Sequence, residues 1–212
     1  MNLYDSSESS GTQMGRSDSK FWPPFSKGES LPGAGVLGMW LFLASLAMPF
    51  FTAIVAFVVM RAKTAEWLPP NYQLPTVLWV STGVLLVASF AVHVGYRAVR
   101  ADRVPTLRRA MACTLIAAVV FSICQFIAWF EIGALHDNPD KGGMYVASFY
   151  LLTVLHAAHV VGGLVLQGWV TFRAYAGHYW SFFHPGVTYS MMYWHFMDVM
   201  WLLLFGTLLL GS

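Results

Sequence analysis

After residue 35 the chain alternates between long apolar stretches and short polar connections. Five stretches are long enough to cross the roughly 30 Å hydrocarbon layer of a membrane, which takes about 20 residues of helix. They run over approximately 36–60, 76–99, 110–131, 145–172 and 188–210. Lipid offers no partner to backbone N–H and C=O groups, and the stretches lack the two-residue period of a barrel strand. The pattern predicts an all-α fold: an integral membrane bundle of five transmembrane helices, antiparallel from one to the next.

The composition excludes a water-soluble fold. Hydrophobic residues make up 57% of the 212 residues and charged residues 10%, against roughly 25% charged in a typical soluble protein. The formal net charge of +2, with no basic cluster among the aromatic residues, argues against a nucleic-acid partner. Cys113 and Cys124 would lie roughly 16 Å apart along one helix, so no disulfide is expected.

Residues 1–34 are rich in Ser and Gly and show no hydrophobic period, which predicts a disordered N-terminal tail before a transmembrane domain over 35–212. No apolar run follows a basic start, so the tail is not expected to be a signal peptide. Nine basic residues flank one side of the predicted bundle: Arg16, Lys20, Lys27, Arg97, Arg100, Arg103, Arg108, Arg109 and Arg173. Three flank the other: Arg61, Lys63 and Lys141. The positive-inside rule then predicts a cytoplasmic N-terminus and an external C-terminus.

Few polar side chains lie within the predicted spans, and such groups usually face the bundle interior because hydrocarbon disfavours them. His156 and His159 are three residues apart in the fourth span, as are His195 and Asp198 in the fifth, so each pair shares a helix face. Docking the two faces would pair Asp198 with a fourth-helix histidine. We therefore predict a structural polar lock of His156, His159, His195, Asp198 and Gln125. A separate prediction assigns Trp40, Trp194 and Trp201 to subunit packing.

Two functional readings compete with the lock. The histidines and Asp198 could hold zinc, copper or iron, or His93 and His156 could ligate a haem, although no HExxH or CxxC spacing supports a dedicated metal site. Intramembrane Asp and His could also relay protons, although Asp198 is the one acid well inside a span. We expect neither a catalytic residue nor a metal site in this chain.

Four segments resemble subunit III of the haem-copper oxidases, the cytochrome c and quinol oxidases, in its short five-helix bacterial form. They are GMWLFLAS over 38–45, LPTVLW over 74–79, FYLLTVLHAAHVVGG over 149–163 and YWHFMDVMW over 193–201. The last is the most specific, and the resemblance covers nearly everything after residue 34. The family pattern commonly has Glu where this chain has Leu46 and Ala128, so proton-related roles of those acids are not carried over.

The resemblance implies a non-catalytic subunit of a respiratory terminal oxidase in the bacterial cytoplasmic membrane. Haem and copper would belong to the catalytic subunit I, which this chain would stabilise during turnover, and phospholipid would be its own ligand. The alternatives are an accessory subunit of a nitric-oxide reductase or a quinol oxidase, or an independent haem- or metal-binding membrane protein.

Overall fold

A computed structural model describes residues 34–64, 74–133, 143–179, 181–182 and 184–211. Within these residues the chain forms five helices and no strand: α1 (Ala34–Lys63), α2 (Thr76–Arg100), α3 (Val104–Gly133), α4 (Gly143–Tyr175) and α5 (Pro185–Gly211). All five are long and apolar enough to span a membrane. The predicted fold class is confirmed, and each predicted span lies inside one helix. The predicted disordered tail, residues 1–34, falls outside the described residues except for Ala34.

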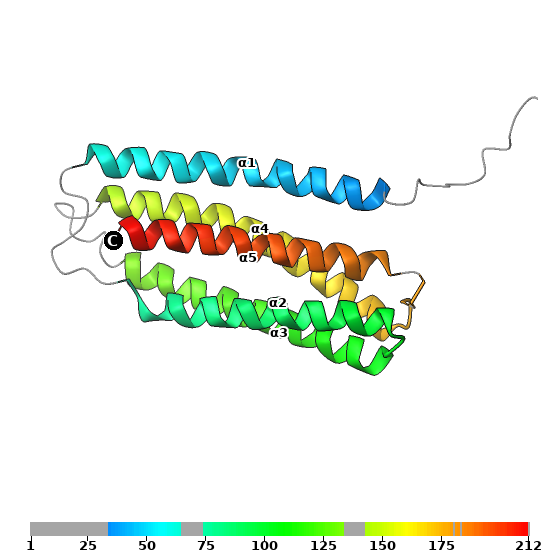
Figure 1. The fold of residues 1–212 in the computed structure, drawn as a ribbon. Coiled ribbons are helices and arrows are strands. Elements are labelled where there is room, and N and C mark those ends of the chain that lie inside the picture. The colour runs from blue at the N-terminus through cyan, green and yellow to red at the C-terminus, as the bar shows by residue number, and fades with distance from the viewer. Residues whose placement is uncertain (1–33, 65–73, 134–142, 180, 183, 212) are drawn as a thin grey trace, which may run out of the picture. The chain divides into compact units, whose positions relative to one another are not determined.

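Four helices form a closed ring in which α2 and α4 each pack against both α3 and α5 (Figure 1). Helix α1 lies outside the ring and touches α4 and α5 through large side chains. The Phe50 ring lies 4.8 Å from the His159 ring of α4 and 6.4 Å from the Phe196 ring of α5, measured between centroids. The buried residues of α1 are spaced to form one narrow stripe: Leu43, Phe50, Ala53 and Phe57.

The ring helices run antiparallel, as contacts along α2 and α5 demonstrate. Near one end of the bundle the Tyr96 ring of α2 lies 6.0 Å from the His184 ring just before α5. Near the other end the Trp79 ring lies 4.9 Å from the Phe205 ring. A tight connection joins α2 to α3 at Asp102, whose φ of 52° is left-handed. The Asp102 carboxylate accepts a hydrogen bond from the Ser181 backbone N–H and so ties this connection to the one before α5.

Glycines allow close approach between helices where the structure requires it. A Cβ at Gly163 of α4 would lie 2.8 Å from Tyr193 Cε1 of α5, so the Tyr193 ring packs directly against the α4 backbone there. Gly168, five residues further along α4, has no such neighbour within 4 Å. Close approach to the α4 backbone therefore occurs at Gly163 and not at Gly168.

Candidate functional site

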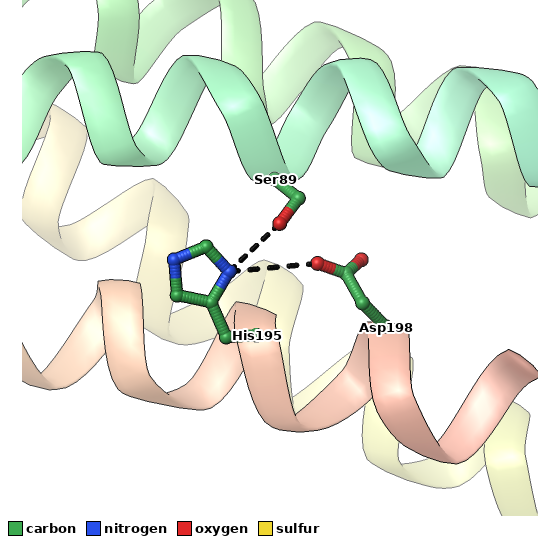
Figure 2. Close-up of polar contacts among 3 residues, drawn as sticks. All are labelled: Ser89, His195 and Asp198. Atoms are coloured by element: carbon green, nitrogen blue, oxygen red, sulfur yellow. Dashed lines mark hydrogen bonds and ion pairs between the residues drawn. The ribbon is translucent and has the colours of Figure 1, made fainter.

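A serine, a histidine and an aspartate meet where α2 packs against α5 (Figure 2). His195 Nδ1 lies 2.8 Å from Ser89 Oγ and 3.7 Å from Asp198 Oδ2. Both partners contact the same ring nitrogen, whereas a nucleophile–base–orienter arrangement would use both nitrogens of the imidazole. The cluster therefore joins α2 to α5 and does not prepare Ser89 for nucleophilic attack.

Asp198 does not pair with a histidine of α4, as the docking of two polar faces had suggested. It is 6% exposed and faces α2, and its described polar neighbours are His195 on its own helix and Ser89. The spacing of three residues correctly places His195 and Asp198 on one face of α5. That face turns toward α2, however, because Trp194 and Tyr193 occupy the side of α5 that meets α4.

His156 and His159 take separate environments on α4. The His156 side chain is 2% exposed and sits among the rings of Phe50, Phe121 and Trp201, with centroid distances of 6.2, 5.8 and 5.1 Å. Neither of its ring nitrogens has a hydrogen-bond partner among the described residues. His159 Nδ1 lies 2.7 Å from the Leu155 carbonyl oxygen of its own helix. In neither residue does the ring bond to a polar group of another helix among the described residues.

Gln125 links α3 to α2. Its amide nitrogen donates to Ser81 Oγ over 3.0 Å, and Ser81 donates in turn to the Leu78 carbonyl. Gln125 and His156 also line a small cavity of about 50 Å³ between α3 and α4. The five residues predicted to form one polar lock are thus divided. Gln125 and His195 make hydrogen bonds between helices, and Asp198 contacts His195 on its own helix. The rings of His156 and His159 make no such bond to another helix among the described residues.

The most highly connected polar side chain among the described residues is Gln167 of α4, which the predicted polar lock does not include. Its side-chain carbonyl accepts from Ser190 Oγ over 2.5 Å and from Trp194 Nε1 over 3.1 Å, both on α5. Its amide nitrogen donates to the Met111 carbonyl of α3 over 3.1 Å. The sequence feature that could have revealed Gln167 is the position of its amide inside a predicted membrane span, because such a polar group requires hydrogen-bond partners inside the protein.

The three tryptophans predicted to serve in subunit packing differ in exposure. Trp194 and Trp201 are both 0% exposed, and their indole N–H groups donate to Gln167 and to Thr82 respectively. Trp40, near the start of α1, is 62% exposed. The first two therefore pack within this chain, whereas Trp40 presents its ring to the surroundings of α1.

Several ionisable side chains of the described residues lie near one another inside the bundle. Among them no three His, Cys, Asp or Glu side chains converge as a metal site would require. His93 lies beside His195, with ring centroids 5.9 Å apart, while His156 is enclosed by aromatic rings from α1, α3 and α5. The structure therefore does not place His93 and His156 in one common environment.

Comparison with known proteins identifies the family. Residues 33–211 match the family model described as cytochrome c oxidase subunit III. The chain belongs to the cytochrome c oxidase subunit III family. Among its relatives, the cytochrome c oxidase subunit 3 of Thermostichus vulcanus is 31% identical over 180 residues, covering 84% of this chain and 87% of the relative. The subunit 3 of Synechocystis sp. is 30% identical over 178 residues, covering 82% and 74%. A probable subunit 3 of Nocardia farcinica is 28% identical, covering 84% and 88%.

Family membership makes this protein a subunit III of a haem-copper oxidase, a multi-pass membrane subunit of a respiratory complex. The YWHFMDVMW segment that carried the resemblance supplies contacts to both neighbours of α5. Toward α4, Tyr193 donates to the His159 carbonyl and Trp194 to Gln167. Toward α2, His195 contacts Ser89 and Trp201 donates to Thr82. One segment of subunit III thus fastens three of the four ring helices together.

Proposed function

We propose that this subunit III carries no redox centre and stabilises the catalytic subunit I, in which the haem and copper of the oxidase would reside. The observation that carries the proposal is the use made of polar side chains inside the membrane. Gln167, Gln125 and Trp201 bond to other helices of the same chain, which is what a packing role requires. Electron transfer would then take place entirely in the neighbouring subunit.

The experiment uses the full chain with an affinity tag, extracted from its own membrane in mild detergent. We expect the tagged chain to bring haem with it, seen as a reduced-minus-oxidised visible spectrum, because the catalytic subunit is retained. When stronger detergent strips the tagged chain from the complex, we expect the haem and copper to stay with the remainder. Haem or stoichiometric metal that follows the stripped chain would overturn the proposal.

We also propose that phospholipid is held along α1. This helix packs on the bundle through its one narrow stripe, and its other faces carry large exposed side chains, among them Leu41 at 65%, Met48 at 72% and Phe51 at 54%. Exposed apolar area of this kind fits acyl chains. Native mass spectrometry of the complex should then find phospholipid that is lost together with this subunit, and loss of the subunit without any lipid would contradict the assignment.

We further propose that the N-terminus lies in the cytoplasm of a bacterial cell. The arginines of the α2–α3 connection, of the helix ends that flank it and of the last turn of α4 gather at one end of the bundle: Arg97, Arg100, Arg103, Arg108, Arg109 and Arg173. Such an excess marks the cytoplasmic side. A protease added to intact spheroplasts should therefore remove a C-terminal tag and spare an N-terminal one, and the reverse pattern would contradict this orientation.

A further inference from the structure

A ladder of aromatic rings follows the seam between α2 and α5. It begins at His184, just before α5, and continues through Tyr96 and His93 of α2 to His195 of α5. Successive ring centroids are 6.0, 6.5 and 5.9 Å apart. His195 then contacts Ser89 and Asp198 (Figure 2). We call these four rings the imidazole seam.

The imidazole seam is open to the outside of the bundle. His93 is exposed, and the His195 side chain is 42% exposed. At 1.5 Å per residue, His93 lies about 10 Å from the end of α2 and His195 about 15 Å from the start of α5. With each helix centred on a hydrocarbon layer of roughly 30 Å, these rings lie about 7 and 10 Å inside it. Two histidines therefore present polar atoms to the surroundings at a depth where lipid provides only acyl chains.

Ionisable side chains at such a depth normally face protein or water because hydrocarbon disfavours them. We propose that the imidazole seam is the face on which this subunit docks against a transmembrane helix of another oxidase subunit, and that this helix carries a carboxylate opposite His93 and His195. The inference rests on the proposed function, which places the chain in a complex with other membrane subunits.

The chemistry of the partner follows from the charges along the seam. The Arg100 guanidinium lies over the Tyr96 ring, 5.6 Å from its centroid, and adds a positive charge at the outer end. Asp198 is buried behind the seam, where its described contacts are with Ser89 and His195. His195 Nδ1 is occupied by these two residues, so Nε2 is the nitrogen available to a partner. A face of imidazoles and arginine is complementary to an acidic group.

A lipid headgroup fits the seam less well than a protein helix does. Phosphate groups lie at the membrane surface, above the depth of His93 and His195, and acyl chains bear no hydrogen-bond acceptor. The other outward surfaces provide a contrast, because Phe130 of α3 is 79% exposed and Val165 of α4 is 71% exposed. Purely apolar side chains of this kind suit lipid, whereas the seam requires polar contacts from its partner.

Photo-crosslinking tests the docking face while leaving the histidines intact. Phe90 is 71% exposed and three residues from His93 on the same face of α2. We would replace it by benzoylphenylalanine in the full chain, within the oxidase in its own membrane, with the same replacement of Phe130 as the matched control. The expected result is an adduct between position 90 and a transmembrane peptide of another oxidase subunit that has Asp or Glu within one helical turn, and lipid adducts at position 130.

Two results would overturn the docking face. One is a position-90 adduct formed with phospholipid alone, and the other is an adduct with a partner peptide that lacks an acid. In either case haem that still copurifies with the tagged chain leaves the proposed function standing. A tagged chain that brings no haem defeats the proposed function itself, and the docking proposal with it.

Substitution of His93 provides a second, independent measurement. His93→Leu removes the polar group from an exposed position, so we expect the ring bundle to fold normally. Retention of this subunit per haem during detergent washing should fall about threefold for one lost membrane hydrogen bond. His93→Gln keeps a donor and should restore most of the retention. Equal retention of the wild type and His93→Leu would overturn the proposal.

Discussion

Two polar centres on α5 start from adjacent residues and differ in nearly every property. Trp194 faces α4 and donates to Gln167, a side chain that is 0% exposed and also bonded to Ser190 and to Met111. His195 faces α2, where the described residues engage only one of its ring nitrogens and its side chain is 42% exposed. The first centre is closed within the chain, and the second is open to the surroundings.

The contrast separates folding from association. A closed polar centre has satisfied its donors and acceptors among the helices of one chain, so its loss should weaken the fold itself. An open centre leaves polar atoms at membrane depth without a described partner, so its loss should matter chiefly when another subunit is bound. The loss in the free energy of unfolding should therefore be largest where the closed centre is broken and smaller at the open one.

Gln167→Leu should produce the largest loss of fold stability. The substitution removes the bonds to Ser190, Trp194 and Met111, and membrane hydrogen bonds average about 0.6 kcal/mol each, so we expect a loss of about 2 kcal/mol. Unfolding of the purified full chain in detergent would measure it. Val165→Leu, on the exposed side of the same helix, is the control. If Gln167→Leu and Val165→Leu have the same free energy of unfolding, the hydrogen bonds of Gln167 do not stabilise the fold.

Gly163→Ala should weaken the contact between α4 and α5 by about 1 kcal/mol, since its Cβ would lie 2.8 Å from Tyr193 Cε1 and overpacking of this kind is costly. Gly168→Ala provides a matched control, because nothing lies within 4 Å of its Cβ and alanine favours helix formation. Thermal unfolding of both variants should show the first destabilised and the second unchanged or stabilised. If Gly168→Ala were destabilised more than Gly163→Ala, α4 and α5 would not be closely packed at Gly163.

Asp198→Asn should change the fold little and the assembly more. The amide keeps the shape of the side chain, so we expect the isolated chain to lose about 0.6 kcal/mol, the average for one membrane hydrogen bond. His195, however, loses the carboxyl group beside its Nδ1, and the share of the subunit retained in the oxidase during detergent washing should fall by more than this loss of stability alone would cause. Unfolding and detergent retention measured on the same variant compare the two effects. If Asp198→Asn unfolds readily in isolation yet stays fully bound in the oxidase, Asp198 stabilises the fold and not the association with another subunit.

His156→Phe should have the smallest effect, within about 0.5 kcal/mol of the wild type. Its ring nitrogens have no partner among the described residues, and aromatic rings already surround it, so an apolar ring of similar shape removes a desolvated polar group at little cost. The unfolding free energy of the full chain measures the change. A loss as large as that of Gln167→Leu would reveal a partner of His156 that the described contacts do not include.

The sequence predicted the helices well and the partners of the polar side chains poorly, for a definite physical reason. Apolar length and the demands of lipid on the backbone determine a span such as 76–99, observed as Thr76–Arg100. Spacing places His195 and Asp198 on one face, but it does not specify which neighbouring helix that face meets. The rotation of α5 depends on packing contributed by α2 and α4 together. The roles of Ser89 and Gln167 as partners of α5 side chains result from that packing, so spacing along the sequence did not predict them.

The most direct test of the central claim is oxygen consumption by the oxidase with and without this subunit. If the subunit acts by packing and carries no redox centre, the stripped oxidase should begin turnover at nearly the rate of the intact complex and then lose activity sooner. Adding back the purified wild-type chain should restore the duration of activity. An initial rate that falls to zero on stripping, and returns only with this chain, would contradict the account.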